Sequence, residues 1–111
     1  MKKIILLSLL SFASASAYAL INCGVIPVKE IAVEANRENG SVWSNTMHIN
    51  IKGSACSGVS HAYLKNDNPA YNSTLSLLMS AHAGGKSVRV VVKSAPGISS
   101  YAREIDYIVM P

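Results

Sequence analysis

The stretch YNSTLSLLMSAHAGGKSVRVVVK, residues 71–93, holds a helix pattern, a stop signal and a strand pattern in direct succession. Over residues 70–83 the apolar side chains recur at helical spacing, which predicts an α-helix. Gly84 and Gly85 end this pattern. Because glycine readily takes the left-handed conformation that closes a helix, we expect one of them to have a positive φ angle. Four valines in residues 87–93 then predict a β-strand.

The triplet Gly85-Lys86-Ser87 also ends many phosphate-binding loops. Such a loop needs a glycine five residues before the Gly-Lys pair, and this chain has Ser80 there. It also needs the order strand, loop, helix, so that the positive helix N-terminus meets the phosphate. The order here is helix, glycines, strand, and the helix presents its partly negative end. The pattern therefore argues against a nucleotide site.

Outward from this stretch, alternating apolar and polar side chains predict further strands. Upstream they cover residues 30–35, 46–52 and 59–64. Asn39-Gly40 is a strong turn signal that makes the first two a hairpin. Asn68 and Pro69 suit the N-cap and first position of the helix. Downstream, residues 104–110 alternate again and predict the last strand.

The predicted protein is mainly β with one helix, in the order strand, strand, strand, helix, strand, strand. Five strands with a helix between the third and fourth is the element order of an OB-fold, a small Greek-key barrel. Barrel closure also removes exposed strand edges, which suits a short chain. The alternative is an open antiparallel sheet with the helix packed on it, and periodicity alone does not separate the two.

The N-terminal segment, residues 1–19, has the layout of a bacterial secretory signal peptide. Two lysines precede a short apolar run and an Ala-Tyr-Ala cleavage motif that ends at Ala19. The apolar run is far shorter than the roughly 20 residues that span a bilayer. We therefore expect cleavage after Ala19, a single domain over residues 20–111, and a secreted or periplasmic protein without membrane insertion.

The two cysteines, Cys23 and Cys56, predict one disulfide in an oxidising compartment. It would tie the start of the first strand to the loop after the second. The alternative is a pair of buried thiols. The three histidines lack the spacing of metal ligands, so we expect neither a metal site nor a cofactor.

The net charge and the lack of catalytic motifs argue against two classes of function, nucleic-acid binding and catalysis. Removal of Lys2 and Lys3 with the signal peptide lowers the formal net charge from +4 to +2. With no basic block in the sequence, we expect no nucleic-acid binding. The acidic residues are scattered, and the sequence has no Gly-x-Ser-x-Gly elbow around a nucleophile. We therefore predict no catalytic residues and a protein that is not an enzyme.

Residues 71–93 resemble a segment of the B subunits of subtilase-cytotoxin and pertussis-like toxins. In both, a helix rich in small and aromatic residues runs into a glycine, a polar pair and a Val-Arg-Ile/Val strand. The ending YIVMP, residues 107–111, resembles that of small secreted bacterial proteins that share this block. The match covers about a quarter of the chain that follows the signal peptide.

This resemblance implies an OB-fold that assembles as a ring of five, binds sialylated host glycans and delivers a separate enzymatic subunit. In those subunits a serine before a Gly-Val-Val-type first strand helps to hold the sugar. The nearest equivalent here is Cys23-Gly24-Val25-Ile26, where the serine is replaced by a cysteine.

Four residues are candidates for a ligand-binding surface. OB-folds bind oligosaccharides and oligonucleotides on the face of strands two and three and with the first and last hairpin loops. Those loops would carry Arg37, Trp43, Tyr101 and Arg103. Aromatic rings stack on sugar faces and arginines pair with acidic groups. The alternation that places Met47 in the core also favours a core position for Trp43.

Two functions remain as hypotheses. The first is a secreted, non-enzymatic binding module for host or surface glycans, which forms a homo-oligomer, a pentamer if toxin-like. The second is a periplasmic structural or inhibitory protein that acts through protein–protein contact.

Overall fold

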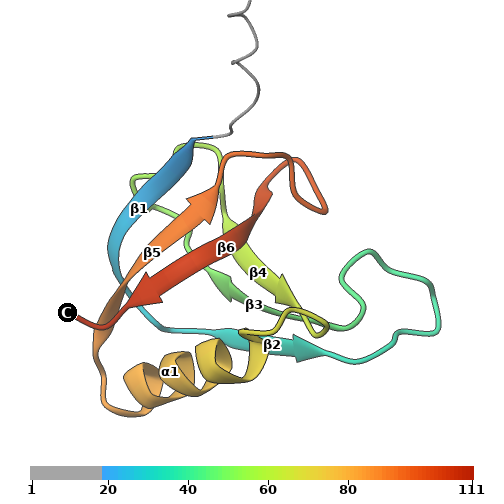
Figure 1. The fold of residues 1–111 in the computed structure, drawn as a ribbon, viewed down its shortest axis with the longest axis horizontal. Helices are drawn as coiled ribbons and strands as arrows, with labels where there is room; N and C mark the ends of the chain where they lie inside the picture. Colours follow the sequence, from blue (N-terminus) through green and yellow to red (C-terminus); the bar gives the residue numbers. More distant parts are fainter. Residues whose placement is uncertain (1–18) are drawn as a thin grey trace, which may run out of the picture.

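The computed structural model describes residues 19–111, which form six β-strands and one α-helix (Figure 1). In chain order these are β1 (Leu20–Pro27), β2 (Ile31–Glu34), β3 (Thr46–Asn50), β4 (His61–Lys65), α1 (Tyr71–Ala83), β5 (Ser87–Lys93) and β6 (Ala102–Val109). The protein is therefore mainly β with one helix, as the sequence predicts. The expected signal peptide, residues 1–19, lies outside the described residues except for Ala19.

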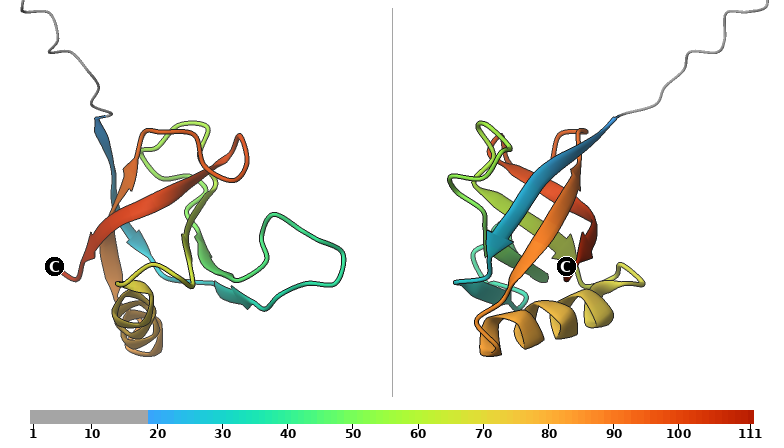
Figure 2. Two further views of the ribbon diagram at one scale, coloured as in Figure 1. Left: turned by 45° about the vertical axis from the view of Figure 1, so that its right-hand side comes forward. Right: turned by 90° about the vertical axis from the view of Figure 1, so that its left-hand side faces the viewer.

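The six strands form one mixed sheet with the order β1-β5-β6-β4-β3-β2. Neighbouring strands are antiparallel except for the parallel pair β4–β6, so the antiparallel part of the predicted alternative is wrong. β1 and β2 lie at opposite ends of this order, but only residues 28–30 separate them in the chain. A connection this short reaches no more than about 14 Å, so the sheet must curl (Figure 2).

The prediction of five strands is wrong, because the described residues form six. The additional strand is β1, and the segment predicted as the first strand is β2. β1 bulges between Asn22 and Val25 where it pairs with β5, and Gly24 within the bulge has a φ angle of 83°. A bulge breaks the regular alternation of inward and outward side chains. β1 therefore lacks the alternation that predicts a strand from sequence.

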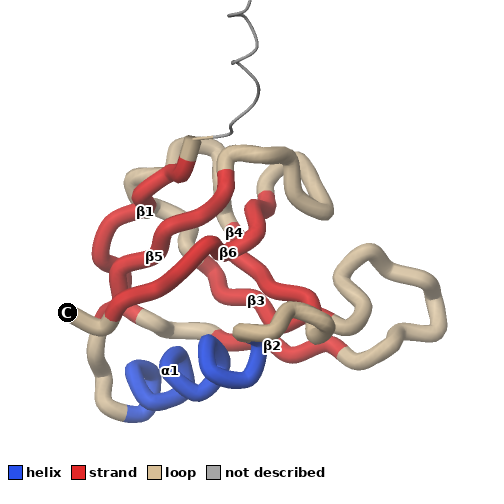
Figure 3. The backbone as a smooth tube through the Cα atoms, viewed as in Figure 1, coloured by secondary structure: helices blue, strands red, loops and turns tan. Residues whose placement is uncertain are grey.

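The hydrophobic core lies inside the curled sheet, and α1 covers one end of it (Figure 3). Ile49 of β3 and Val90 of β5 are buried there, as are Leu78 and Ala81 of α1. Full burial of a side chain the size of Leu78 stabilises the fold by about 2–3 kcal/mol. Within the described part of the chain, no helix is long and apolar enough to span a membrane.

The C-terminus of α1 is closed by glycine, as predicted. Gly85 has a φ angle of 66°, whereas Gly84 has an ordinary φ of −89°. The N–H of Lys86 donates to the carbonyl of Ala81 at 2.8 Å, and the N–H of Gly85 donates to that of His82 at 3.2 Å. These two bonds form a Schellman motif, which needs a left-handed residue at the position of Gly85.

The N-terminus of α1 differs from the prediction. The helix begins at Tyr71, two residues after Pro69, and Ala70 takes the N-cap position. Asn68 still accepts a backbone hydrogen bond, from the N–H of Ala70 to its Oδ1 at 2.8 Å. Its side chain therefore forms a turn before the helix and does not cap it.

The predicted disulfide between Cys23 and Cys56 is confirmed. It joins β1 to the loop between β3 and β4, with the two Cα atoms 4.7 Å apart. Both residues are buried, at 1% and 4% exposure. The Ala55 N–H donates to the Cys23 carbonyl at 3.2 Å, so a backbone bond supports the same connection.

Candidate functional site

Five aromatic rings gather on the outer face of the β3–β4 hairpin. They belong to Trp43, His48, His61, Tyr63 and Tyr101, and we call them the ring cluster. The Trp43 ring centre lies 4.6 Å from that of His48, 5.7 Å from His61, 6.2 Å from Tyr63 and 6.3 Å from Tyr101. His61 also lies 5.6 Å from His48 and 5.9 Å from Tyr101. Trp43 is thus in ring contact with all four other members.

Strand pairing places three of these rings on one face. His48 of β3 is paired with Tyr63 of β4, and His61 is two residues before Tyr63 on the same strand. Residues paired across strands and residues two apart along a strand share a face. Their neighbours Met47 and Ile49 point the other way and are buried in the core. The core side of the hairpin therefore fixes the direction in which the rings project.

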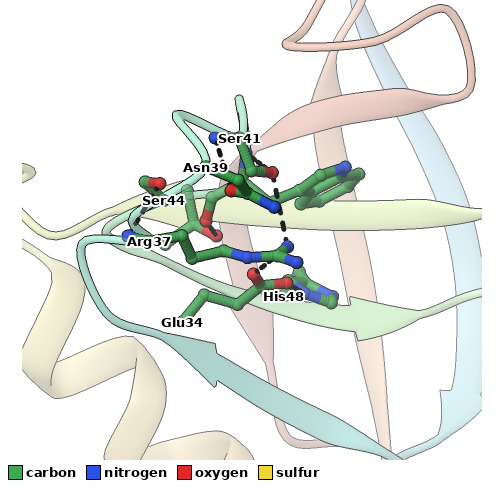
Figure 4. Close-up of polar contacts among 8 residues, drawn as sticks. Glu34, Arg37, Asn39, Ser41, Ser44 and His48 are labelled. Atoms are coloured by element: carbon green, nitrogen blue, oxygen red, sulfur yellow. Dashed lines mark hydrogen bonds and ion pairs between the residues drawn. The ribbon is translucent and has the colours of Figure 1, made fainter.

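The loop between β2 and β3, residues 35–45, brings Trp43 to the cluster. A chain of polar contacts holds this loop (Figure 4). Arg37 Nη1 donates to Glu34 Oε1 at 2.8 Å and to Ser41 Oγ at 3.3 Å. The Arg37 N–H donates to Ser44 Oγ at 3.1 Å, and the Trp43 N–H donates to Ser41 Oγ at 3.1 Å. Trp43 therefore lies on a turn that is held by hydrogen bonds.

Glu34 connects this loop to the ring cluster. Its Oε2 lies 2.9 Å from His48 Nε2, while its Oε1 accepts from Arg37. The hydrogen bond from His48 and the nearby Arg37 guanidinium together hold the pKa of Glu34 below its ordinary value. The carboxylate thus remains charged under mildly acidic conditions and bridges β3 to the 35–45 loop.

The loop between β5 and β6, residues 94–101, brings Tyr101 to the cluster. The Tyr101 carbonyl accepts backbone hydrogen bonds from Ser60 at 2.9 Å and from His61 at 3.3 Å. Gly97 of this loop packs so closely that an added Cβ would lie 3.0 Å from Tyr63 Cε1 and would collide with the Ala102 carbonyl. The close approach therefore requires glycine at this position.

Burial shifts the pKa of two ring-cluster members. It lowers the pKa of His61, and His48 and Lys52 lower it further against an opposing effect of Glu30. It raises the pKa of Tyr63, and Glu104 adds to the rise. Both side chains are therefore favoured in their uncharged forms.

The structure brings together three of the four residues predicted to bind a ligand. Trp43 and Tyr101 are in the ring cluster, and Arg37 is joined to it through Glu34. Arg103 has a different position, because its Nη1 donates to the carbonyls of Ser100 and Ala102 at 3.3 and 3.1 Å and so supports the loop that ends at Tyr101. The interpretation of Trp43 as a core residue is wrong, since it is half-buried at the surface.

Three ring-cluster members were not among the predicted site residues: His48, His61 and Tyr63. His48 lies on the face of β3 opposite the buried Met47 and Ile49. The signal that could have found the others was strand pairing, because a hairpin of residues 46–52 and 59–64 in the observed register sets His48 opposite Tyr63.

A separate hollow of about 640 Å³ opens beside the disulfide, between β1 and residues 50–55. It meets the ring-cluster face through Asn50, which lines the hollow and pairs with His61. Among residues 19–111, no group of three or more His, Cys, Asp or Glu side chains is placed to hold a metal ion.

Comparisons with known proteins identify no relative. The chain matches no protein-family model, and neither a curated protein nor a solved structure shows significant similarity to it.

Proposed function

We propose that this protein is an exported, non-enzymatic binding module that holds a glycan on the ring cluster. The observation that carries the proposal is the convergence of Trp43, Tyr101 and three further rings from two loops and two strands. Aromatic faces stack on the apolar faces of sugars, and neighbouring imidazoles and carboxylates can bond to hydroxyl groups.

We further propose that the fold is an OB-type barrel whose first strand is divided into β1 and β2. If these two are counted as one bent strand, five strands remain, with α1 between the third and fourth. The parallel pair β4–β6 and the short β1–β2 connection support this interpretation. OB-folds bind ligands on the face of strands two and three and with the adjoining loops. In this chain those are β3, β4, the 35–45 loop and the 94–101 loop, where the ring cluster lies.

The disulfide supports export, because such bonds persist in oxidising compartments. The resemblance of residues 71–93 to toxin B subunits adds the proposal of a homo-oligomer, a pentamer in a toxin-like assembly. Cys23, at the place of the sugar-holding serine, is buried in the disulfide and offers no hydroxyl group. In our proposal the ring cluster therefore holds the sugar.

A glycan array probed with wild type, Trp43→Ala and Tyr101→Ala tests the proposal. We expect wild type to bind a defined group of glycans and both variants to lose that signal. Tyr107→Ala is the matched control, because Tyr107 is exposed to a similar degree (48% against 44% for Tyr101) and lies outside the ring cluster. Thermal melts must show that all four proteins are folded. Loss in the control, or retention in both cluster variants, would contradict the proposal.

A second candidate function, binding of a partner protein, is favoured by another surface. The outer face of β1, β5 and β6 exposes Leu20, Val25, Tyr107 and Val109. Exposed apolar side chains gathered on one face are a feature of protein interfaces. Pull-down from the native host with wild type, Tyr107→Ala and Trp43→Ala separates the two functions. A single partner lost only in Tyr107→Ala, together with a blank array, would favour the protein–protein function.

A further inference from the structure

Two of the three histidines in this chain touch each other within the ring cluster. The ring centres of His48 and His61 are 5.6 Å apart, and both rings contact Trp43. His61 in addition packs against Tyr101. A positive charge on either imidazole would therefore lie among packed aromatic rings.

The surroundings of the two histidines are unequal. His48 faces the carboxylate of Glu34 at 2.9 Å, which can balance one positive charge. His61 Nδ1 lies 2.8 Å from the Ser60 hydroxyl, and no carboxylate among residues 19–111 is bonded to this ring. Glu30 is the acidic group that acts on it from a distance.

The remaining charged and titratable groups near the pair come from several elements. Lys52 follows β3 and opposes a charge on His61, and Arg37 in the 35–45 loop already shares the Glu34 carboxylate through Oε1. Tyr63 and Tyr101 contribute phenol groups, and burial raises the pKa of Tyr63. The Glu34 carboxylate can thus balance one positive charge at the pair. A positive charge on His61 is opposed by His48 and Lys52.

We propose that the His48–His61 pair is a proton-sensitive switch that keeps the ring cluster packed when His61 is neutral and opens it when His61 takes up a proton beside His48. Repulsion by His48 and Lys52 then turns the charged His61 ring toward water, and its contacts with Trp43 and Tyr101 are lost. Arg37 and His48 use different oxygens of Glu34, so the 35–45 loop remains anchored while the rings separate.

The consequence for ligand binding rests on the proposed function. A glycan that covers the cluster removes water from His61 and lowers its pKa further. Once the pH is below the pKa of His61 in the complex, each pKa unit of that shift weakens glycan binding about tenfold. Binding is therefore strong near neutral pH and weak in an acidic compartment.

The switch itself can be tested without a ligand, because Trp43 is the only tryptophan in the chain. Its emission is recorded on the full-length protein from about pH 8 to about pH 5, where histidine titrates. We expect a shift to longer wavelength, as water reaches the indole, with a midpoint below the ordinary histidine value of 6.5. His61→Gln should abolish the shift. His82→Gln is the matched control, since His82 bonds to the Val28 carbonyl at the helix end, and it should leave the shift unchanged.

Imidazole NMR titration of wild type keeps the test valid if a variant fails to fold, and His61 should titrate below the ordinary histidine value of 6.5. Emission that does not change with pH, the same transition in His61→Gln, or a His61 pKa at or above the ordinary value of 6.5 would overturn the switch. A glycan array read at the two pH extremes separates the two proposals. If the array shows no binding at either pH but Trp43 emission still changes with pH, the proposed glycan binding is contradicted and the switch is supported.

Discussion

Removal of the Cys23–Cys56 disulfide should destabilise the fold by about 3.5–4 kcal/mol. The bond closes a loop across a sequence separation of 33 residues. In the chain-entropy model, opening a loop of that length raises the entropy of the unfolded chain by the equivalent of about 3.7 kcal/mol at 25 °C. For a domain of this size the melting temperature should then fall by roughly 15–30 °C. The variant is Cys23→Ala/Cys56→Ala, and urea and thermal melts followed by circular dichroism measure the change.

Reduced wild type is the control for packing, because it keeps both buried sulfur atoms but lacks the bond. If loop closure dominates, reduced wild type and the double alanine variant should unfold at similar urea concentrations. The bond also holds the loop that leads into His61, so both samples should show weaker Trp43–His61 packing as a Trp43 emission shift. A loss of less than about 1 kcal/mol would refute the entropy argument. Two reactive thiols in exported protein, labelled under denaturing conditions, would refute the bond itself.

Three further predictions concern single residues. Gly97→Ala should destabilise the fold and shift Trp43 emission, because its Cβ would collide with the backbone of β6 and crowd Tyr63; an unchanged melt would contradict the close packing of the 94–101 loop. Gly85→Ala should cost about 1–2 kcal/mol in urea melts, because Gly85 has a φ angle of 66°, and Gly84→Ala should cost less. Glu34 has a lowered pKa, so its contribution to stability is present above the ordinary value of 4.5 and is lost as the pH falls through the folded value. Glu34→Gln should therefore lower the stability of the fold near neutral pH, and the stability of the variant should fall less in acid than that of wild type. Parallel acid-denaturation curves for variant and wild type would contradict this.

The parts of the fold that could be predicted are those with strong local signals. The helix end, the valine-rich β5 and the β2–β3 hairpin each depend on side-chain periodicity or on a glycine that a turn requires. β1 could not be predicted in this way, because its bulge at Gly24 breaks the alternation and its partner β5 is distant in sequence. The parallel β4–β6 pair is also a long-range contact, which periodicity does not encode.

The candidate site could be predicted only for residues on loops. Trp43 and Tyr101 followed from the expected places of two hairpin loops, and the structure brings their rings to within 6.3 Å of each other. His48 and His61 could not be predicted as site residues, because a histidine on the polar face of a strand is usually an ordinary surface residue. Their contact depends on the β3–β4 register and on the turn that folds Trp43 over them. Sequence spacing specifies neither of these.

The most direct test of the ring cluster as a glycan site is Trp43 emission during titration with the glycan that binds most strongly on the array. A sugar stacked on the indole removes water from it, so the account predicts a saturable shift to shorter wavelength in wild type and in Tyr107→Ala. The shift should be much weaker in Tyr101→Ala. A glycan that binds by calorimetry but leaves Trp43 emission unchanged would contradict the account, because the binding surface would then lie elsewhere on the protein.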